Sequence, residues 1–201
     1  RNSLNVVEIS NAVIQASDGD PESVASSTGL ISEAVANLSY LVEQGSFLND
    51  LMHKTPWLVP VNLTRLVRGL EPALADMAET HGGRDLRFNL PDGDAPALAG
   101  GDEALLTRAV RAMAENAIRR TAPGGRVEIG LRQKLADYHL EVFDDGPALP
   151  RETVEGLFTP FHIEWQTPGG LPDGFGFDLP IAHLVTRLCG GDLRAGSAAR
   201  G

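Results

Sequence analysis

The sequence predicts an α+β protein in which an N-terminal helical hairpin precedes an α/β sandwich. Three observations lead to this fold class. Apolar residues recur at heptad spacing near the N-terminus, alternating apolar and polar residues mark strands further on, and the proline-containing stretch TPWLVPVN (55–62) separates the two patterns. We therefore predict a hairpin domain over residues 1–56 and a second domain over residues 57–201.

Composition and charge narrow the classes of partner. The 201 residues carry a formal net charge of −10, which disfavours nucleic acid because phosphates bind basic surfaces. No apolar run reaches the ~20 residues that a membrane-spanning helix needs, so we expect no membrane contact from this chain. The single cysteine, Cys189, precludes an intramolecular disulfide and fits a cytoplasmic location. Because the chain starts at Arg1 without a signal pattern, we interpret it as part of a longer protein.

The hairpin prediction depends on a long heptad pattern. Residues 1–16 form the first predicted helix, residues 17–23 a turn, and residues 28–52 the second helix. Steps of three and four separate the apolar positions of the second helix, which are Ile31, Ala34, Leu38, Leu41, Gly45, Leu48 and Met52. One hairpin has few ways to bury two apolar faces, so we predict a homodimer whose hairpins pair into a four-helix bundle. The alternative is a monomeric hairpin packed on the rest of the chain.

Helix and strand signals alternate in the second domain. Asn62 and Asp102 are suitable N-cap residues for two long helices. Apolar and polar residues alternate over 126–133 and 137–145, as expected for half-buried strands of a mixed sheet with helices on one face. The other predicted elements are a strand at 86–90, helices at 63–81, 104–120, 150–161 and 179–189, and a closing turn and strand at 190–197.

Four short stretches carry residues suited to a binding site. They are AENAIRRTAPGG (114–125), VFDDGPALP (142–150), LFTPF (157–161) and DGFGFDLPIA (173–182). Each has an ordinary explanation when taken alone: an exposed helix, a turn, a core aromatic pair, or a glycine-rich turn before a helix. Their order and spacing along the chain are more specific than any single stretch.

In this order the stretches resemble the four nucleotide-binding boxes of sensor histidine kinases. NAIRRTAPGG is similar to the asparagine box, DDGPALP to the first glycine box, LFTPF to the phenylalanine box, and GFGFDL to the second glycine box. CGGDLRAGS also resembles the segment that follows the last box. The resemblance covers nearly the whole chain. It implies an ATPase domain of the histidine kinase type, protein-histidine kinase activity, and ATP and Mg²⁺ as cofactors.

The resemblance also implies roles for individual residues. Asp144 would accept a hydrogen bond from the adenine amino group, and the amide oxygen of Asn116 would bind Mg²⁺. Arg119 would approach the phosphates, and Phe158 would anchor the lid together with Phe161. Glycine backbone N–H groups at the start of the last helix would face the phosphates. The ATP-binding residues that the resemblance implies are Asn116, Arg119, Arg120, Asp144, Gly146, Phe158, Gly174, Gly176 and Phe177.

The N-terminus resembles the end of the family's phospho-acceptor motif. RNSL matches the last four positions of H-E-[LI]-R-x-P-L, with Ser3 in place of proline. The acceptor histidine is therefore expected three residues before Arg1, and we expect no catalytic residue within this chain. The resemblance implies transfer of a phosphoryl group from ATP to that histidine and then to the receiver domain of a response regulator.

Several positions depart from the family pattern. Ala112 stands where the family usually has Asn or Glu, Arg120 replaces an aromatic residue that packs on adenine, and Ala148 replaces a glycine. Asp178 also replaces a glycine, and as the N-cap of the last helix it would compete for phosphate-binding amides and repel ATP.

These departures leave two alternatives open. The first is a degenerate kinase-like protein with weak or no ATP binding, which acts as a scaffold, a phosphotransfer module or a phosphatase partner. The second is another ATPase of the same superfamily, against which the heptad hairpin argues.

Overall fold

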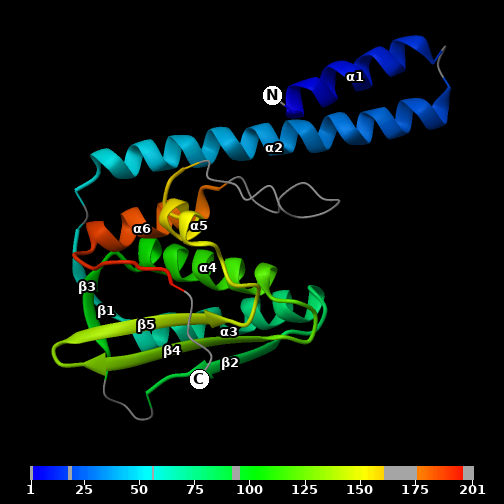
Figure 1. Cartoon of the computed structure of the whole chain (residues 1–201). Helices are drawn as coiled ribbons and strands as arrows, with labels where there is room; N and C mark the ends of the chain where they lie inside the picture. Colours follow the sequence, from blue (N-terminus) through cyan, green and yellow to red (C-terminus); the bar gives the residue numbers. More distant parts are fainter. Residues whose placement is uncertain (1, 18–19, 56, 92–95, 161–175, 197–201) are drawn as a thin grey trace. The chain divides into compact units, whose positions relative to one another are not determined.

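The computed structural model describes residues 2–17, 20–55, 57–91, 96–160 and 176–196. The chain divides into two compact units, Arg1–Met52 and His53–Gly201. Figure 1 shows two long helices in the first unit and packed helices and strands in the second. The predicted α+β class is therefore confirmed, while the pairing of two hairpins stays a prediction. Within the described residues, no helix combines the length and apolar character needed to span a bilayer.

The first unit is a hairpin of α1 (Asn2–Ala16) and α2 (Pro21–His53), visible in blue and cyan in Figure 1. The turn predicted over 17–23 was too long, because α2 begins at Pro21 rather than at Thr28. Proline suits the first helical position, where its missing N–H is not needed. The Asp20 carboxylate then accepts a hydrogen bond from the Ser23 backbone N–H at 2.9 Å. Hydrogen bonds from Ser23 lower the pKa of Asp20, so this carboxylate caps the helix in its charged form.

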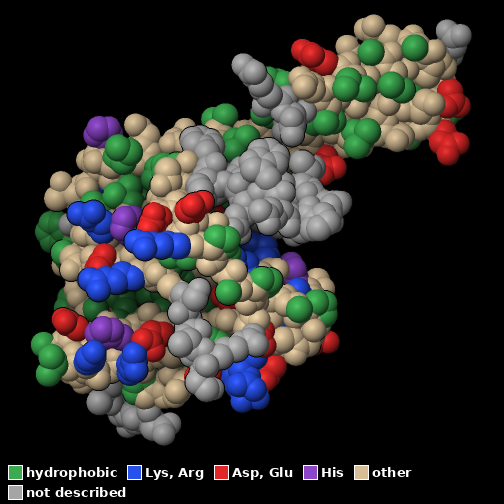
Figure 2. Space-filling view, viewed as in Figure 1, with side chains coloured by type: hydrophobic (Ala, Val, Ile, Leu, Met, Phe, Trp, Pro, Cys, Tyr) green, Lys and Arg blue, Asp and Glu red, His purple; other side chains and the backbone are tan. Residues whose placement is uncertain are grey.

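The hairpin by itself leaves much of its apolar surface uncovered. Of the predicted heptad positions, Ala34 is buried, Ile31 and Leu38 are half-buried, and Met52 is 66% exposed. Figure 2 shows apolar side chains spread over the visible surface of the hairpin. Besides Met52, the exposed large apolar side chains of the two helices are Leu4, Ile9, Val13, Leu30, Val35 and Val42.

The described residues of the second unit form two small sheets. In the three-stranded sheet, β4 (Arg126–Lys134) lies between β2 (Asp85–Asn89), which is parallel to it, and β5 (Asp137–Asp144), which is antiparallel. In the other, β1 (Val59–Asn62) pairs antiparallel with β3 (Leu98–Gly101). The sequence analysis missed β1 and β3, because proline and glycine obscure the strand signal in four-residue strands and are tolerated at sheet edges.

Two long helices cover one face of the three-stranded sheet. They are α3 (Leu63–Thr80) and α4 (Glu103–Arg120), and both begin at the predicted N-caps: Asn62 Oδ1 accepts from Arg65 N, and Asp102 Oδ1 from Leu105 N. A buried hydrophobic cluster joins these elements and contains Val67, Leu70 and Leu74 from α3, Val110, Ala114 and Ile118 from α4, and Val127 and Ile129 from β4. Each fully buried Val, Leu or Ile contributes about 1.5–3 kcal/mol, so this core fixes α4 firmly on the sheet.

The C-terminal part of the second unit differs from the sequence predictions at two places. The helix predicted over 150–161 is shorter, because α5 (Arg151–Gly156) ends at a glycine and Pro160 follows soon after. The last helix, α6 (Asp178–Leu188), packs on α4 as Figure 1 shows. The strand predicted within 190–197 is not formed over residues 191–196. After α6 the chain turns at Gly190, whose φ is +79°, and runs along a cavity without joining the ladder of β5.

The cap of α4 leads to a stability prediction. A hydrogen bond from the Leu105 N–H, aided by Lys54 at 3.3 Å, lowers the pKa of Asp102. A lowered folded-state pKa stabilises the protein above the unfolded pKa of about 3.9, and this contribution disappears as the pH falls through the folded pKa. Asp102→Ala should therefore lower the free energy of unfolding by ~1 kcal/mol at pH 7 and by much less near pH 2.5. Urea unfolding at both pH values checks this, and an equal loss at the two values would contradict it.

Candidate functional site

A cavity of about 710 Å³ lies in the second unit at the C-terminal ends of α4 and β5. The loop between β5 and α5, the start of α6 and the segment after α6 complete its walls. Its size is within the range of small-molecule sites, and its walls combine apolar side chains with a few polar groups. The polar and charged lining residues are Asn116, Arg120, Glu141, Asp144, Asp145 and Arg194.

One face of α4 forms a wall of this cavity. Met113, Asn116, Ala117 and Arg120 line it, and their spacing of three and four residues places them on one side of the helix. Ala112 is 8% exposed and does not line the cavity, so the departure from the family pattern at this position lies beside the site rather than in it.

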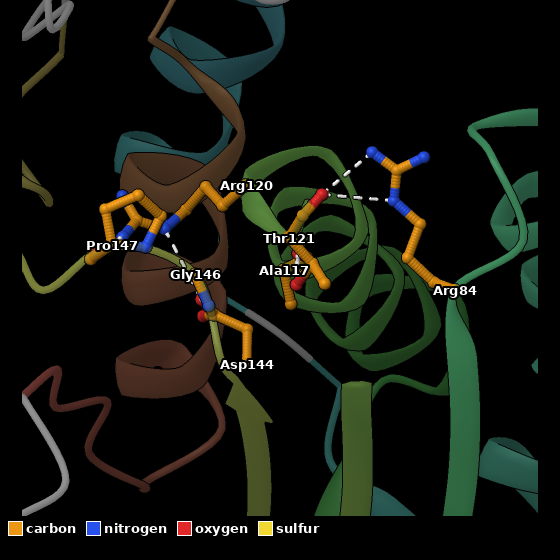
Figure 3. Close-up of polar contacts among 7 residues, drawn as sticks. All are labelled: Arg84, Ala117, Arg120, Thr121, Asp144, Gly146 and Pro147. Atoms are coloured by element: carbon orange, nitrogen blue, oxygen red, sulfur yellow. Dashed lines mark hydrogen bonds and ion pairs between the residues drawn. The ribbon is translucent and has the colours of Figure 1, made fainter. Parts of the chain in front are cut away.

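The loop after β5 is built around Asp144 and Gly146. Figure 3 shows the Asp144 side chain turned toward the following loop, where its Oδ1 accepts a hydrogen bond from Gly146 N at 3.0 Å. A Cβ atom on Gly146 would lie 2.6 Å from this oxygen and 2.9 Å from the backbone oxygen of Arg120. Only glycine lets the loop pass so close to the end of α4. Ala148, which replaces the second glycine of the predicted box, lines the cavity as well.

Arg120 connects the end of α4 with this loop. Its Nη2 donates to the Pro147 carbonyl oxygen at 2.7 Å, and its Nε lies 3.8 Å from Asp144 Oδ1 (Figure 3). The two charged side chains are 20% and 24% exposed, so solvent screens their attraction only in part. The residue that stands in place of an aromatic base-packing residue is thus already engaged with the loop.

The neighbouring Arg119 lies outside the cavity lining and pairs with two carboxylates. Its guanidinium is 3.6 Å from Glu115 on the same helix and 3.5 Å from Asp178 at the start of α6. The prediction that Asp178 is the N-cap of the last helix was wrong. Phe177 holds that position without a side-chain cap, and Asp178 is the first helical residue. Its carboxylate pairs with a cation on the facing helix, so its repulsion of phosphate is smaller than the sequence suggested.

The remaining predicted site residues divide into three groups. Phe158 lines the cavity and stacks on His183 of α6, with 4.8 Å between the ring centroids. Gly176 has a φ of +69°, a conformation that favours glycine, but neither it nor Phe177 lines the cavity, and Phe177 is 2% exposed. Gly174, like the lid-anchor candidate Phe161, lies outside the described residues.

Arg84, which no sequence pattern singled out, stabilises the end of α4. Its Nε and Nη2 both donate to the Thr121 carbonyl oxygen, at 3.1 and 2.8 Å (Figure 3). The Thr121 hydroxyl in turn donates to the Ala117 carbonyl at 2.8 Å. These contacts satisfy backbone groups that a helix end leaves unpaired. No short sequence pattern predicts these contacts, because Arg84 and Thr121 are 37 residues apart.

The segment after α6 was also missed as part of the site. Leu193, Arg194, Ala195 and Gly196 line the cavity. Arg194 Nε donates to Asp192 at 2.7 Å, and this hydrogen bond lowers the pKa of Asp192. The hydrogen bond therefore favours the charged form of the Asp192 carboxylate, next to a residue that lines the cavity.

The described residues fit a Mg²⁺ ion with few protein ligands better than a metal ion whose ligands all come from the protein. They contain no cluster of three or more His, Cys, Asp or Glu side chains that could hold a metal ion. The Asn116 side chain lines the cavity and offers an amide oxygen. Mg²⁺ commonly takes one or two protein oxygens and completes its shell with phosphates and water, so a single Asn oxygen suits it.

Comparison with known proteins assigns the chain to a family. The family described as "Histidine kinase-, DNA gyrase B-, and HSP90-like ATPase" matches residues 101–201, which include α4, the cavity loop and α6. Sensor protein kinase PmrB of Pseudomonas aeruginosa is 28% identical over 190 residues, which are 90% of this chain and 37% of PmrB. The chain thus spans little more than a third of that relative.

Solved structures share the same fold. A structure titled full-length ShkA in complex with AMPPNP has a TM-score of 0.66 at 23% identity, and the match covers 85% of this chain and 35% of ShkA. A structure of histidine kinase ThkA in complex with the response regulator protein TrrA has a TM-score of 0.62 at 20% identity, with 80% and 47% covered.

The family match and the fold agree. The chain belongs to the histidine kinase-, DNA gyrase B- and HSP90-like ATPase family. Of the relatives reported above, PmrB is described as a sensor protein kinase and ThkA as a histidine kinase, in agreement with the resemblance of the four boxes.

Proposed function

We propose that this chain is the dimerisation and ATP-binding core of a sensor histidine kinase in a two-component system. The observation that carries the proposal is the meeting of predicted box residues at one cavity: Asn116 and Arg120 from α4, Asp144 and Gly146 after β5, and Phe158 after α5. The γ-phosphoryl group of ATP would pass to a histidine nitrogen outside this chain. The bond between the γ-phosphorus and the bridging oxygen would break, ADP would leave, and an aspartate of a response regulator would then accept the phosphoryl group.

The chain's own residues would bind and orient the nucleotide. Asp144 would accept a hydrogen bond from the adenine amino group, where guanine presents a carbonyl oxygen instead. Asn116 would hold Mg²⁺ through its amide oxygen. Mg²⁺ would neutralise charge on the phosphates, which together with positioning carries most phosphoryl-transfer catalysis. Phe158, stacked on His183, would connect the cavity with α6.

Relatives support the proposed partners and setting. The ShkA structure contains a nucleotide analogue and the ThkA structure contains a response regulator, which supports ATP and a receiver domain as ligands of this chain. PmrB is much longer than this chain, which supports a place within a larger sensor protein. These relatives are described as sensor kinases, so they do not favour the scaffold alternative.

Nucleotide titration tests the role of Asp144. We expect wild type to bind ATP and adenosine and to bind GTP poorly. Asp144→Asn should weaken adenosine and ATP binding by ~1–3 kcal/mol, because the adenine amino group loses a charged acceptor. Calorimetric titration of both proteins provides the measurement. Equal affinity of wild type for ATP and GTP would remove Asp144 from base recognition.

Removing the carboxylate of Asp178 tests its pairing with Arg119. Asp178→Gly should release Arg119 from one of its two carboxylate partners, at 3.5 Å, and make it available to phosphates. ATP binding should tighten by roughly 1 kcal/mol while adenosine binding stays constant, because only ATP carries the charge. Glu115→Gln provides a matched comparison on the other side of Arg119. If ATP and adenosine shift equally, the Arg119 pair does not control phosphate affinity.

The exposed apolar side chains of the hairpin support the homodimer. Val35 and Val42 are one heptad apart on α2 and are 50% and 68% exposed in the single chain. An exposed apolar stripe at heptad spacing is typical of a helix that packs against another helix, here one of a second copy. Val42→Asp or Val35→Asp should therefore yield monomers at tens of micromolar without lowering helix content.

Sedimentation and circular dichroism provide the two measurements. Ala36→Asp is the matched control, since this exposed alanine lies about 100° around the helix from Val35 and should leave the dimer intact. A monomeric wild type under the same conditions would exclude the proposed dimer.

A further inference from the structure

Hydrogen bonds of the following residue fix the backbone position of Arg120 at the end of α4. It is the last residue of α4, and the next residue, Thr121, is tied down on two sides. Arg84 donates twice to the Thr121 carbonyl, and the Thr121 backbone N–H donates to Ala117 O at 3.1 Å. The Arg120 side chain therefore projects from a fixed point into the cavity.

The loop that receives Arg120 is equally well defined. Asp145 N donates to Arg126 O at 3.2 Å, which fastens the loop to the start of β4. Gly146 passes so close to the Arg120 backbone oxygen that a Cβ atom would be 2.9 Å from it. The Pro147 carbonyl then accepts from Arg120 Nη2 at 2.7 Å. The loop thus lies between the backbone of Arg120 and its guanidinium.

The same contacts orient the Asp144 carboxylate. Oδ1 accepts from Gly146 N and faces Arg120 Nε at 3.8 Å (Figure 3). Both of these contacts are made by Oδ1, so we expect Oδ2 to be the oxygen that meets a ligand. Both oxygens belong to a side chain that lines the cavity.

We propose that Arg120 is a specificity-determining positioning residue. By holding the Pro147 carbonyl and facing Asp144 Oδ1, it fixes the carboxylate in the orientation that distinguishes adenine from guanine. We name this pair of contacts the Arg120 clamp. The clamp acts at the base end of the nucleotide and not on its phosphates. This inference rests on the proposed function, because it concerns how the same cavity selects its base.

The test compares base and phosphate recognition in matched variants. Arg120→Ala should weaken adenosine and ATP binding by the same factor, about tenfold, and reduce the preference for ATP over GTP. Arg120→Lys should be intermediate, since a single ammonium can replace one contact but not the guanidinium's two separate contacts. Arg111→Ala removes an exposed arginine from the same helix and should bind as wild type does. Thermal melting of each variant establishes that it is folded.

A double-mutant cycle determines whether Arg120 acts through Asp144. In an Asp144→Asn background, Arg120→Ala should have little further effect on the preference for ATP over GTP. Full additivity would overturn the clamp, as would an Arg120→Ala variant that loses ATP affinity while keeping adenosine affinity. An unchanged ATP-to-GTP preference in both Arg120 variants would overturn it too. If wild type binds neither ATP nor adenosine, the proposed function itself fails, and the clamp fails with it.

Discussion

The packing of α4 on the three-stranded sheet is the constraint on which the rest of the second unit depends. Val110, Ala114 and Ile118 bury one side of the helix in the core, and Ile118 is 0% exposed. Asn116 and Arg120 then face the cavity because the period of an α-helix puts them on the other side. Any rotation of α4 that moved these polar side chains would also expose the core. The same orientation of α4 is therefore needed for both the core packing and the geometry of the cavity.

The charge pattern at the end of α4 differs between its two consecutive arginines. Arg120 faces Asp144 and the loop after β5, whereas the adjacent Arg119 faces Glu115 and Asp178. Adjacent helix residues point about 100° apart, so two consecutive arginines serve two different surroundings. An acidic protein with a net charge of −10 has particular need of such cations if it is to bind a polyanionic nucleotide.

The sequence predicted most of the second unit because its signals are local. Asn62 and Asp102 cap helices at the expected positions, and β4 and β5 follow the alternating pattern. Predictions failed where a competing contact decided the outcome. Aspartate is a residue type that often caps helices, so Asp178 was predicted as an N-cap. Its carboxylate instead pairs with an arginine on the facing helix. The segment after α6 has strand-like residues, yet it runs along the cavity instead of pairing with β5.

The sequence by itself determined the class of fold and the order of the boxes, and it predicted which residues would contact a base. These properties depend on residue type and on spacing within one helix, strand or turn. Only the tertiary structure decided that Arg84 closes the end of α4, that Arg120 reaches Pro147, and that Asp178 pairs with Arg119. Each of these contacts joins residues 27 to 59 positions apart, and a side chain's choice among distant partners depends on how the core brings the elements together.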